Sequence, residues 1–333
     1  MSRLILVPTR QCNLRCSYCP TVKDGWPSLT PADALRAIDI FLASFGTGDI
    51  KLFGGEPLLA PDVVDAVITR AERDRRIESV TLCTNGIRLD ESWLERIRDC
   101  EKLVVAVSLD GTPEDNRRFR RQLVSDDAYD HLAALAGSLC RLPRVVVTQV
   151  IPPASATRAA LNFQHLLELG FRRFKILPAC YVPWSESQLA CLREGFEAIA
   201  KIVCTMWRSG EHVYIRNLFS LSAQPTFNTA MTVDADRRIY SSDFVLTDLS
   251  DDARDSMCLG TIDSPPTRAA LSEAAARFEM TIESYFSPAI WSSTRNADAE
   301  LTRFCRMLYP AWRQWRRRRT AGDHSASNEA RTA

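Results

Sequence analysis

The chain has 333 residues, a formal net charge of +1 at pH 7 and 46% hydrophobic residues. A chain of this length buries a large core, so we expect one barrel-sized domain with a smaller appendage. The near-zero charge argues against a nucleic-acid partner, and the lack of a long apolar run or a basic and apolar leader argues against a membrane partner; we therefore expect a cytoplasmic protein.

Six short β-rich runs alternate with helical patterns over the first half of the chain. They are LILVP from Leu4, IKLF from Ile50, SVTLCT from Ser79, LVVAVSL from Leu103, RVVVTQV from Arg144 and RFKIL from Arg173. This alternation predicts parallel strands joined by right-handed helical crossovers. An open Rossmann-like sheet is the rival, but its GxGxxG fingerprint is absent after the first strand. The prediction is an α/β fold, a partial (β/α)6 barrel.

Three cysteines, Cys12, Cys16 and Cys19, lie within the eight residues of CNLRCSYC, directly after the first predicted strand. Soft thiolates at this density indicate zinc or an iron–sulfur cluster. Zinc in a structural site needs a fourth ligand, and neither a second CxxC nor an HxxxH follows at a usable spacing. Secreted disulfide scaffolds are short, so the eleven cysteines of this long chain are expected to be reduced thiols.

Polar motifs also follow the other predicted strands. They are GGEP at 54–57, CTNG at 83–86, SLDG at 108–111, the single residue Gln149, and LPACY at 177–181. Because the chemistry of such barrels gathers at the carboxyl ends of the strands, we expect these motifs to share one rim. Ordinary roles remain open for several of them: GGEP as a strand-to-helix turn, Asn85 with Gly86 as a turn pair, and Gln149 as a core amide.

The CxxxCxxC spacing, followed by GGEP after the second strand, resembles the radical S-adenosylmethionine (SAM) superfamily. The resemblance implies that Cys12, Cys16 and Cys19 hold a [4Fe–4S] cluster whose open iron is chelated by SAM. It further implies an enzyme that forms a 5'-deoxyadenosyl radical, which abstracts hydrogen from a substrate, and a reducing donor of the flavodoxin or ferredoxin type. TNG and SLDG resemble the equivalent strand ends of the molybdenum-cofactor cyclase and peptide-maturase branches.

By the same resemblance, the SAM-binding residues lie in these loops, and Glu56 offers an acceptor to the amino group of SAM. The expected set is Tyr18, Gly54, Gly55, Glu56, Pro57, Thr84, Asn85, Ser108, Asp110 and Gln149. The segment DNRRFRR at 115–121 resembles a family loop that carries an arginine near the SAM ribose or the substrate. A solvated charged turn is the alternative, and the sequence does not single out one arginine. No further catalytic side chain is identified.

The second half of the chain changes character after a long helical pattern from Ser187 to Trp207. A β-hairpin is expected, with strands at 231–233 and 238–241. Its sequence resembles that of the SPASM or twitch appendage of peptide-modifying enzymes. Here the hairpin ends in Ser241 and Ser242, and hydroxyls do not replace thiolates as iron ligands. We therefore expect an appendage without an auxiliary cluster; the alternative is a cluster held by Cys180, Cys258 and Cys305.

These patterns predict a barrel over 1–210, an α+β appendage over 211–320 and a disordered tail over 321–333. The arginine run 316–319 is interpreted as a solvated helix end. The SPASM resemblance favours a peptide substrate, to be cross-linked, epimerised or dehydrogenated. A small molecule, such as a sugar, an amino acid or a cofactor precursor, is the alternative. A non-catalytic iron–sulfur or SAM-binding protein is the alternative from a different class.

Overall fold

A ten-stranded sheet forms the centre of the computed structural model, which describes residues 2–123, 127–219 and 229–329. The six predicted strands are all present and all parallel, which confirms the α/β prediction. They are β1 (Arg3–Leu6), β3 (Gly48–Leu52), β4 (Ile77–Thr84), β5 (Leu103–Ser108), β7 (Val145–Ile151) and β8 (Arg173–Pro178). The sheet order is β12-β11-β10-β1-β3-β4-β5-β7-β8-β9.

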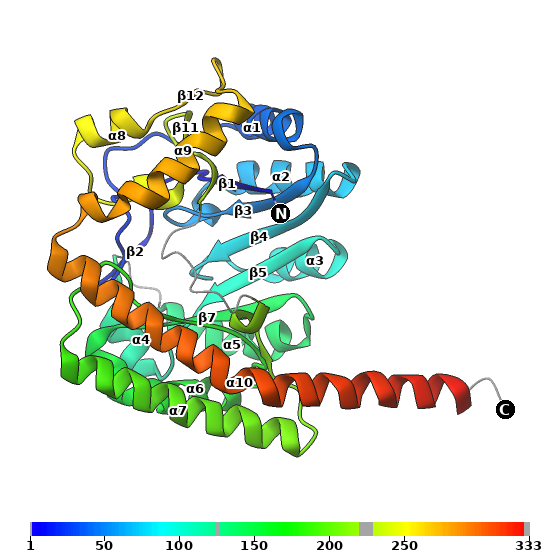
Figure 1. Cartoon of the computed structure of the whole chain (residues 1–333). Coiled ribbons are helices and arrows are strands. Elements are labelled where there is room, and N and C mark those ends of the chain that lie inside the picture. The colour runs from blue at the N-terminus through cyan, green and yellow to red at the C-terminus, as the bar shows by residue number, and fades with distance from the viewer. Residues whose placement is uncertain (1, 124–126, 220–228, 330–333) are drawn as a thin grey trace.

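The predicted crossover helices cover one face of this sheet (Figure 1). They are α1 (Pro31–Phe45), α2 (Pro61–Arg73), α3 (Glu91–Asp99), α5 (Ala128–Arg141) and α6 (Ala159–Glu168), with the short α4 (Pro113–Phe119) before α5. Local sequence sets their ends: α1 begins at a capping box of Thr30 and Asp33 and ends at Gly46, whose φ is +82°.

Alternation along the strands separates two faces of the sheet. Ile50 and Leu52 of β3, like Phe174 and Ile176 of β8, belong to the core that packs against the helices. The residues between them point to the opposite side, which we call the inner face. Side chains at the carboxyl ends of the strands are thereby held by a large apolar core on one side and are free to form a site on the other.

The predicted hairpin is confirmed, with β10 (Thr229–Val233) antiparallel to β11 (Arg238–Ser242). It does not stand apart from the barrel, because β10 pairs in parallel with β1 and extends the same sheet. β12 (Gly260–Thr261) follows at that edge, and β9 (Tyr214–Ile215) lies at the opposite edge beside β8. Strands from both predicted domains therefore share one sheet, and the division at residue 210 stays a prediction.

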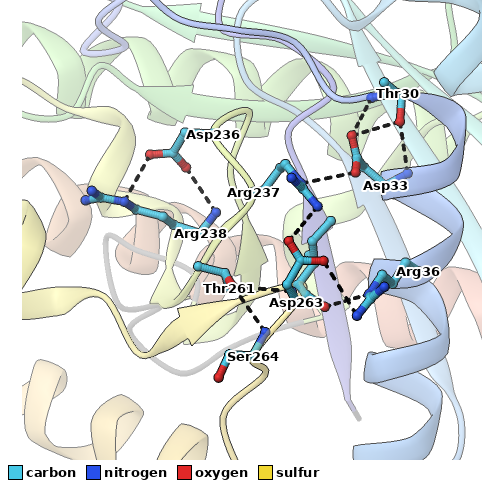
Figure 2. A network of polar contacts seen from close by, with 10 residues as sticks. Thr30, Asp33, Arg36, Asp236, Arg237, Arg238, Thr261, Asp263 and Ser264 are labelled. Atoms are coloured by element: carbon cyan, nitrogen blue, oxygen red, sulfur yellow. Dashed lines mark hydrogen bonds and ion pairs between the residues drawn. The ribbon is translucent and has the colours of Figure 1, made fainter.

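The turn of the hairpin is tied to α1 by surface charges (Figure 2). Arg237 lies between two carboxylates, with Nε 3.2 Å from Asp33 of α1 and Nη2 2.6 Å from Asp263. Arg36 of α1 reaches Asp263 at 3.6 Å from the other side. These exposed ion pairs connect the hairpin turn to α1, and each contributes little to the stability of the fold.

The remaining helices are α7 (Glu186–Arg208), α8 (Asp251–Met257), α9 (Arg268–Thr281) and α10 (Pro288–Glu329). α10 packs along α7, with Phe304 on Phe196 at 4.9 Å and Trp315 on Trp207 at 5.9 Å between ring centroids. It then projects beyond the body of the molecule (Figure 1). Among the described residues, no helix is both long and apolar enough to cross a membrane.

One expectation for the carboxyl end differs from the structure: the arginine run 316–319 lies inside α10 rather than at a helix end. α10 continues through 321–329, and the disordered tail over 321–333 stays a prediction. Extending an existing helix costs far less than starting one, so polar residues follow the packed part of α10 as further turns. Residues 330–333 lie outside the described residues.

Candidate active site

The cysteine loop leaves β1 at the carboxyl edge of the sheet and is braced by a short strand pair. β2 (Leu14–Cys16) pairs antiparallel with β6 (Arg120–Gln122), so that Cys16 lies opposite Arg120. Cys19 is held by its N–H, which donates to the carbonyl of Cys16 at 3.1 Å. In the described part of the chain, no three His, Cys, Asp or Glu side chains converge on a single metal ion. In a four-iron cluster, by contrast, each thiolate binds a different iron.

Two cations flank the cysteine thiols. Nζ of Lys23 donates to Sγ of Cys19 at 3.2 Å, and Nη1 of Arg120 lies 4.0 Å from Sγ of Cys16. Burial raises the pKa of the Cys16 thiol to about 12, against the opposing effect of Arg120. A metal that binds these sulfurs displaces their protons, and the two cations offset the negative charge that thiolates then bring.

A buried polar network fixes the wall behind Cys16. Asp110 accepts from the hydroxyl of Tyr18 at 2.6 Å, from Nη2 of Arg120 at 2.9 Å and from the N–H of Val150 at 3.0 Å. Burial raises the pKa of the Tyr18 hydroxyl, so this group stays protonated and donates to the carboxylate. Asp110 therefore links the cysteine loop to the ends of β5 and β7, and it orients Arg120 toward Cys16.

Glu56 of GGEP is only 1% exposed, and its carboxylate holds the neighbouring loop in place. It accepts from the N–H of Leu58 at 3.0 Å, the hydroxyl of Thr84 at 2.7 Å and the N–H of Asn85 at 2.6 Å. Burial raises its pKa to about 6, and these hydrogen bonds oppose the rise. At neutral pH the carboxylate is ionised and presents an acceptor at the predicted rim.

The two glycines of GGEP are explained by the cysteine loop. Gly54 has a φ of +130°, which disfavours any residue with a side chain. At Gly55, an added Cβ would lie 2.0 Å from the carbonyl oxygen of Gln11. The N–H of Gly55 donates to the carbonyl of Thr9, and that of Glu56 to the carbonyl of Gln11. The close approach required here is between two backbone segments, and Pro57 then begins a buried turn of 3₁₀ helix (Pro57–Leu59).

Asn85 brings the TNG loop against the cysteine loop. Its Nδ2 donates to Oδ1 of Asn13 at 2.7 Å and lies 3.9 Å from Sγ of Cys12. Its Oδ1 accepts from the N–H of Ile87, as in an ordinary turn. Asn85 thus has both the turn role and a place beside the predicted cluster ligands.

Ser108 and Gln149 lie on opposite faces of the sheet. Ser108 ends β5 on the inner face, opposite Thr148 of β7. Gln149 is fully buried and lies on the same face of β7 as Val147 and Ile151, which pack against the helices. Its Nε2 donates to the carbonyl of Ala159 at the start of α6, at 3.4 Å. The placement of Gln149 matches the core-amide interpretation, and its proposed SAM contact has no support from this geometry.

The cysteines considered for a second cluster come from three different segments of the fold. Cys258 lies between α8 and β12 at the top of Figure 1, whereas most of α10, which carries Cys305, runs across the bottom. Burial raises the pKa of the Cys180 and Cys305 thiols to about 12 each, with Asp298 acting in the same direction. Ser242 is buried and its hydroxyl accepts from the N–H of Phe244 at 3.2 Å, so it caps a helical turn.

Sequence reasoning missed Lys23 and did not single out Arg120. The segment RRFRR offered four arginines, and only the pairing of β6 with β2 places Arg120 beside Cys16. Lys23 lies four residues after Cys19, a spacing that carried no signal by itself. A pocket of about 290 Å³ opens beside Cys12 and is lined in part by Asn13 and Lys23. Three clustered thiols, two cations and adjoining space fit an anionic iron–sulfur cluster.

Comparison with known proteins gives matches in both sequence and fold. The family model of the radical SAM superfamily matches residues 6–150. The GTP 3',8-cyclase of Mycolicibacterium smegmatis is 32% identical over 171 residues, which are 49% of this chain and 46% of that protein. A probable GTP 3',8-cyclase of Archaeoglobus fulgidus is 34% identical over 121 residues, 36% of this chain and 39% of that protein. The chain spans less than half the length of these two curated relatives.

The fold match extends further along the chain than the sequence matches. The solved structure of anSMEcpe with bound AdoMet has a TM-score of 0.72 at 17% identity, and the match covers 93% of this chain and 97% of that one. At this identity the likeness shows the fold alone. The family match at 6–150 includes the cysteine loop, GGEP, TNG and SLDG, the segments that the geometry brings together around Cys12, Cys16 and Cys19. Residues 6–150 of this chain therefore match the radical SAM superfamily, a superfamily of enzymes whose cofactors are a [4Fe–4S] cluster and S-adenosylmethionine.

Proposed function

We propose that this protein is a radical SAM enzyme that abstracts hydrogen from a small-molecule substrate. One observation carries the choice of substrate: the two curated relatives, at 32% and 34% identity, are both named as GTP 3',8-cyclases, and GTP is a small molecule. This reverses the preference for a peptide that followed from the SPASM-like hairpin. Because these matches cover less than half of this chain and less than half of each relative, GTP itself is not assigned as the substrate.

The chain's own residues support this chemistry in distinct ways. When bound, the cluster and SAM supply a 5'-deoxyadenosyl radical. Cys12, Cys16 and Cys19 would hold the cluster, and Lys23 and Arg120 would offset its charge. Glu56 and Asn85 lie on the same rim, where an ionised carboxylate and a side-chain amide suit the amino acid portion of SAM. An external donor of the flavodoxin or ferredoxin type would supply the electron.

A peptide substrate is the second candidate. The observation in its favour is the extent of the fold match: anSMEcpe is similar over 93% of this chain, and a further structure of that protein holds AdoMet and the Cp18Cys peptide. The hairpin of this chain ends in Ser241 and Ser242 rather than in cysteine. The peptide reading therefore rests on shared architecture.

The deciding experiment measures 5'-deoxyadenosine. The full chain is reconstituted anaerobically with iron and sulfide, reduced, and incubated with SAM and either the small-molecule or the peptide fraction of a cell extract. We expect the small-molecule fraction to stimulate 5'-deoxyadenosine formation. Stimulation by the peptide fraction alone would overturn the choice of substrate. If no 5'-deoxyadenosine forms while the cluster spectrum is intact, the radical activity itself is refuted.

A further inference from the structure

The inner face of the sheet carries two lysines that the cluster site does not use. Lys175 lies between Phe174 and Ile176 of β8, which face the helices, so its side chain points to the inner face. Lys51 lies between Ile50 and Leu52 of β3 and points the same way. Lys175 is near the middle of β8, and Lys51 lies one residue before the carboxyl end of β3.

The two ammonium groups are close enough to affect each other's charge. Strands β3 and β8 are separated by β4, β5 and β7, which in a flat sheet would place them about 19 Å apart. Yet the charge of Lys51 depresses the pKa of Lys175, as do Arg216 and Arg3. The two side chains, which alternation places on the same face, therefore lie within electrostatic range of each other over the inner face.

Lys51 and Lys175 differ in their partners. Lys51 pairs with Asp243 at 3.2 Å and lies 3.8 Å from the centre of the Phe53 ring. Nζ of Lys175 has no hydrogen-bond or ion-pair partner among the described residues. Segment 220–228, outside the described residues, contains no Asp or Glu that could serve as one.

Other charged and titratable groups near Lys175 do not neutralise it. Asp49 of the inner face is already held by Ser79 at 2.7 Å and pairs with Arg3. Asp298 of α10 acts on the thiols of Cys180 and Cys305. The thiol of Cys83 acts in the opposite direction and favours the charged form of Lys175. Burial and the surrounding cations lower the pKa of Lys175 to about 8, so at neutral pH the amine is mostly charged.

Such an arrangement lowers the stability of the free protein, which indicates a role in binding. A half-buried ammonium without a counter-ion, facing a second cation, costs free energy that a methionine of similar size would not. An anion placed between the two lysines would remove this cost. Hydroxyls lie next to this position, because Thr148 of β7 is the register partner of Lys175, and Ser108 of β5 is the register partner of Thr148. They add donors suited to oxyanions.

We propose that Lys175 and Lys51, with Thr148 and Ser108, form an anion-binding subsite on the inner face that takes a carboxylate or phosphate group of the substrate. The inference rests on the proposed function, since it places the substrate over the inner face, below the predicted cluster. It adds that the small molecule is an anion. It also gives Ser108 a substrate role in place of the SAM contact expected from sequence.

The test uses the reconstituted full chain and two simple probes, inorganic phosphate and succinate. Equilibrium dialysis measures their binding to the wild type and to Lys175→Met, Lys51→Met and Lys175→Arg. We expect one probe to bind saturably, and each methionine variant to weaken it by about tenfold, the worth of one charge-assisted contact. Lys175→Arg keeps the charge and should retain binding. The probe that binds tells phosphate from carboxylate recognition.

The matched control is Lys201→Met, which removes an exposed lysine of α7 and should leave binding unchanged. Probe binding should also weaken as the pH rises through about 8, because Lys175 then loses its proton. Equal binding by wild type and Lys175→Met would overturn the proposal, as would failure of both probes to bind the wild type at roughly 10 mM. Thermal melting of each variant confirms that it is folded.

The outcomes separate this proposal from the proposed function, because probe binding needs no turnover. Lysine-dependent binding in a chain that forms no 5'-deoxyadenosine would refute the radical activity and leave the anion subsite standing. Active SAM cleavage by a wild-type chain whose probe binding does not depend on either lysine would refute the subsite alone.

Discussion

The guanidinium of Arg10 donates to the carboxylate of Asp234, and both side chains are completely buried. Nε of Arg10 lies 2.9 Å from Oδ1 of Asp234, across 224 positions of sequence. The same guanidinium packs 3.6 Å from the centre of the Trp26 ring. Because Arg10 lies just before Cys12 and Asp234 opens the turn between β10 and β11, the pair joins the cysteine loop to the hairpin.

We expect Arg10→Met to destabilise the fold by about 3–5 kcal/mol, because it leaves the Asp234 carboxylate buried without its partner. Urea unfolding of the chain measures the difference in unfolding free energy. Arg237→Ala is the matched control: its side chain is 46% exposed and pairs with Asp33 and Asp263, so its loss should cost about 1 kcal/mol or less. Equal losses in the two variants would contradict a structural role for the buried pair.

We expect Cys16→Ala to abolish the cluster, as should Cys12→Ala and Cys19→Ala, because each removes one of the three predicted iron ligands. Iron analysis after reconstitution should fall from about four irons per chain to background. Cys258→Ala is the control and should keep the full iron content, since this thiol lies outside the cysteine loop and donates to the Gly260 carbonyl. About eight irons per wild-type chain would show that a second cluster exists after all.

The six parallel strands could be predicted from the sequence because each is a short apolar run bounded by turn residues, as buried parallel strands are. The pairing of β10 with β1 could not be predicted from the sequence, since it depends on contacts such as Arg10 with Asp234 that join distant parts of the chain. The pairing of β2 with β6 could not be predicted from the sequence for a different reason. Each strand has three residues, and Arg120 and Arg121 give β6 no apolar alternation.

Some residues of the candidate site could likewise be predicted from the sequence, and others could not. Glu56 and Asn85 could be found because GGEP and TNG directly follow strands, and the structure brings both against the cysteine loop. Gln149 shows what the sequence could not predict. It lies near the end of β7, but a shift of one position decides which face a strand residue occupies, and Gln149 shares the helix-packed face with Val147 and Ile151. Four arginines of DNRRFRR look alike in sequence, and only strand pairing distinguishes Arg120.

We expect Arg120→Gln to make the cluster harder to reduce. The Arg120 guanidinium lies 4.0 Å from Sγ of Cys16, and a nearby positive charge favours the reduced, more negative state. Its removal should lower the midpoint potential by roughly tens of millivolts. A redox titration followed by electron paramagnetic resonance measures this value.

Two variants control the Arg120 experiment. Arg120→Lys keeps the charge and should keep a potential near that of the wild type. Arg121→Gln removes the neighbouring exposed arginine and should have no effect. A potential that is the same in Arg120→Gln and Arg121→Gln would show that the guanidinium does not act on the cluster.

We expect SAM binding to weaken as the pH falls through about 6. Burial raises the pKa of Glu56 from 4.5 to about 6, so acidification neutralises the carboxylate that we propose accepts the SAM amino group. Glu56→Gln should weaken SAM binding about tenfold at neutral pH and should remove this step from the pH profile. Equilibrium binding of SAM over this pH range measures both effects, with the exposed Glu91→Gln as control.

The stability of the fold should depend on Glu56 in the opposite direction. Because the folded pKa of about 6 lies above the ordinary value of 4.5, the folded chain takes up this proton more readily than the unfolded chain. The contribution to stability is therefore full below about 4.5 and is lost as the pH rises through about 6. Opposite pH trends in SAM affinity and in unfolding free energy, both absent from Glu56→Gln, would identify Glu56 as the group responsible. An unchanged affinity profile in that variant would place the amino group of SAM elsewhere.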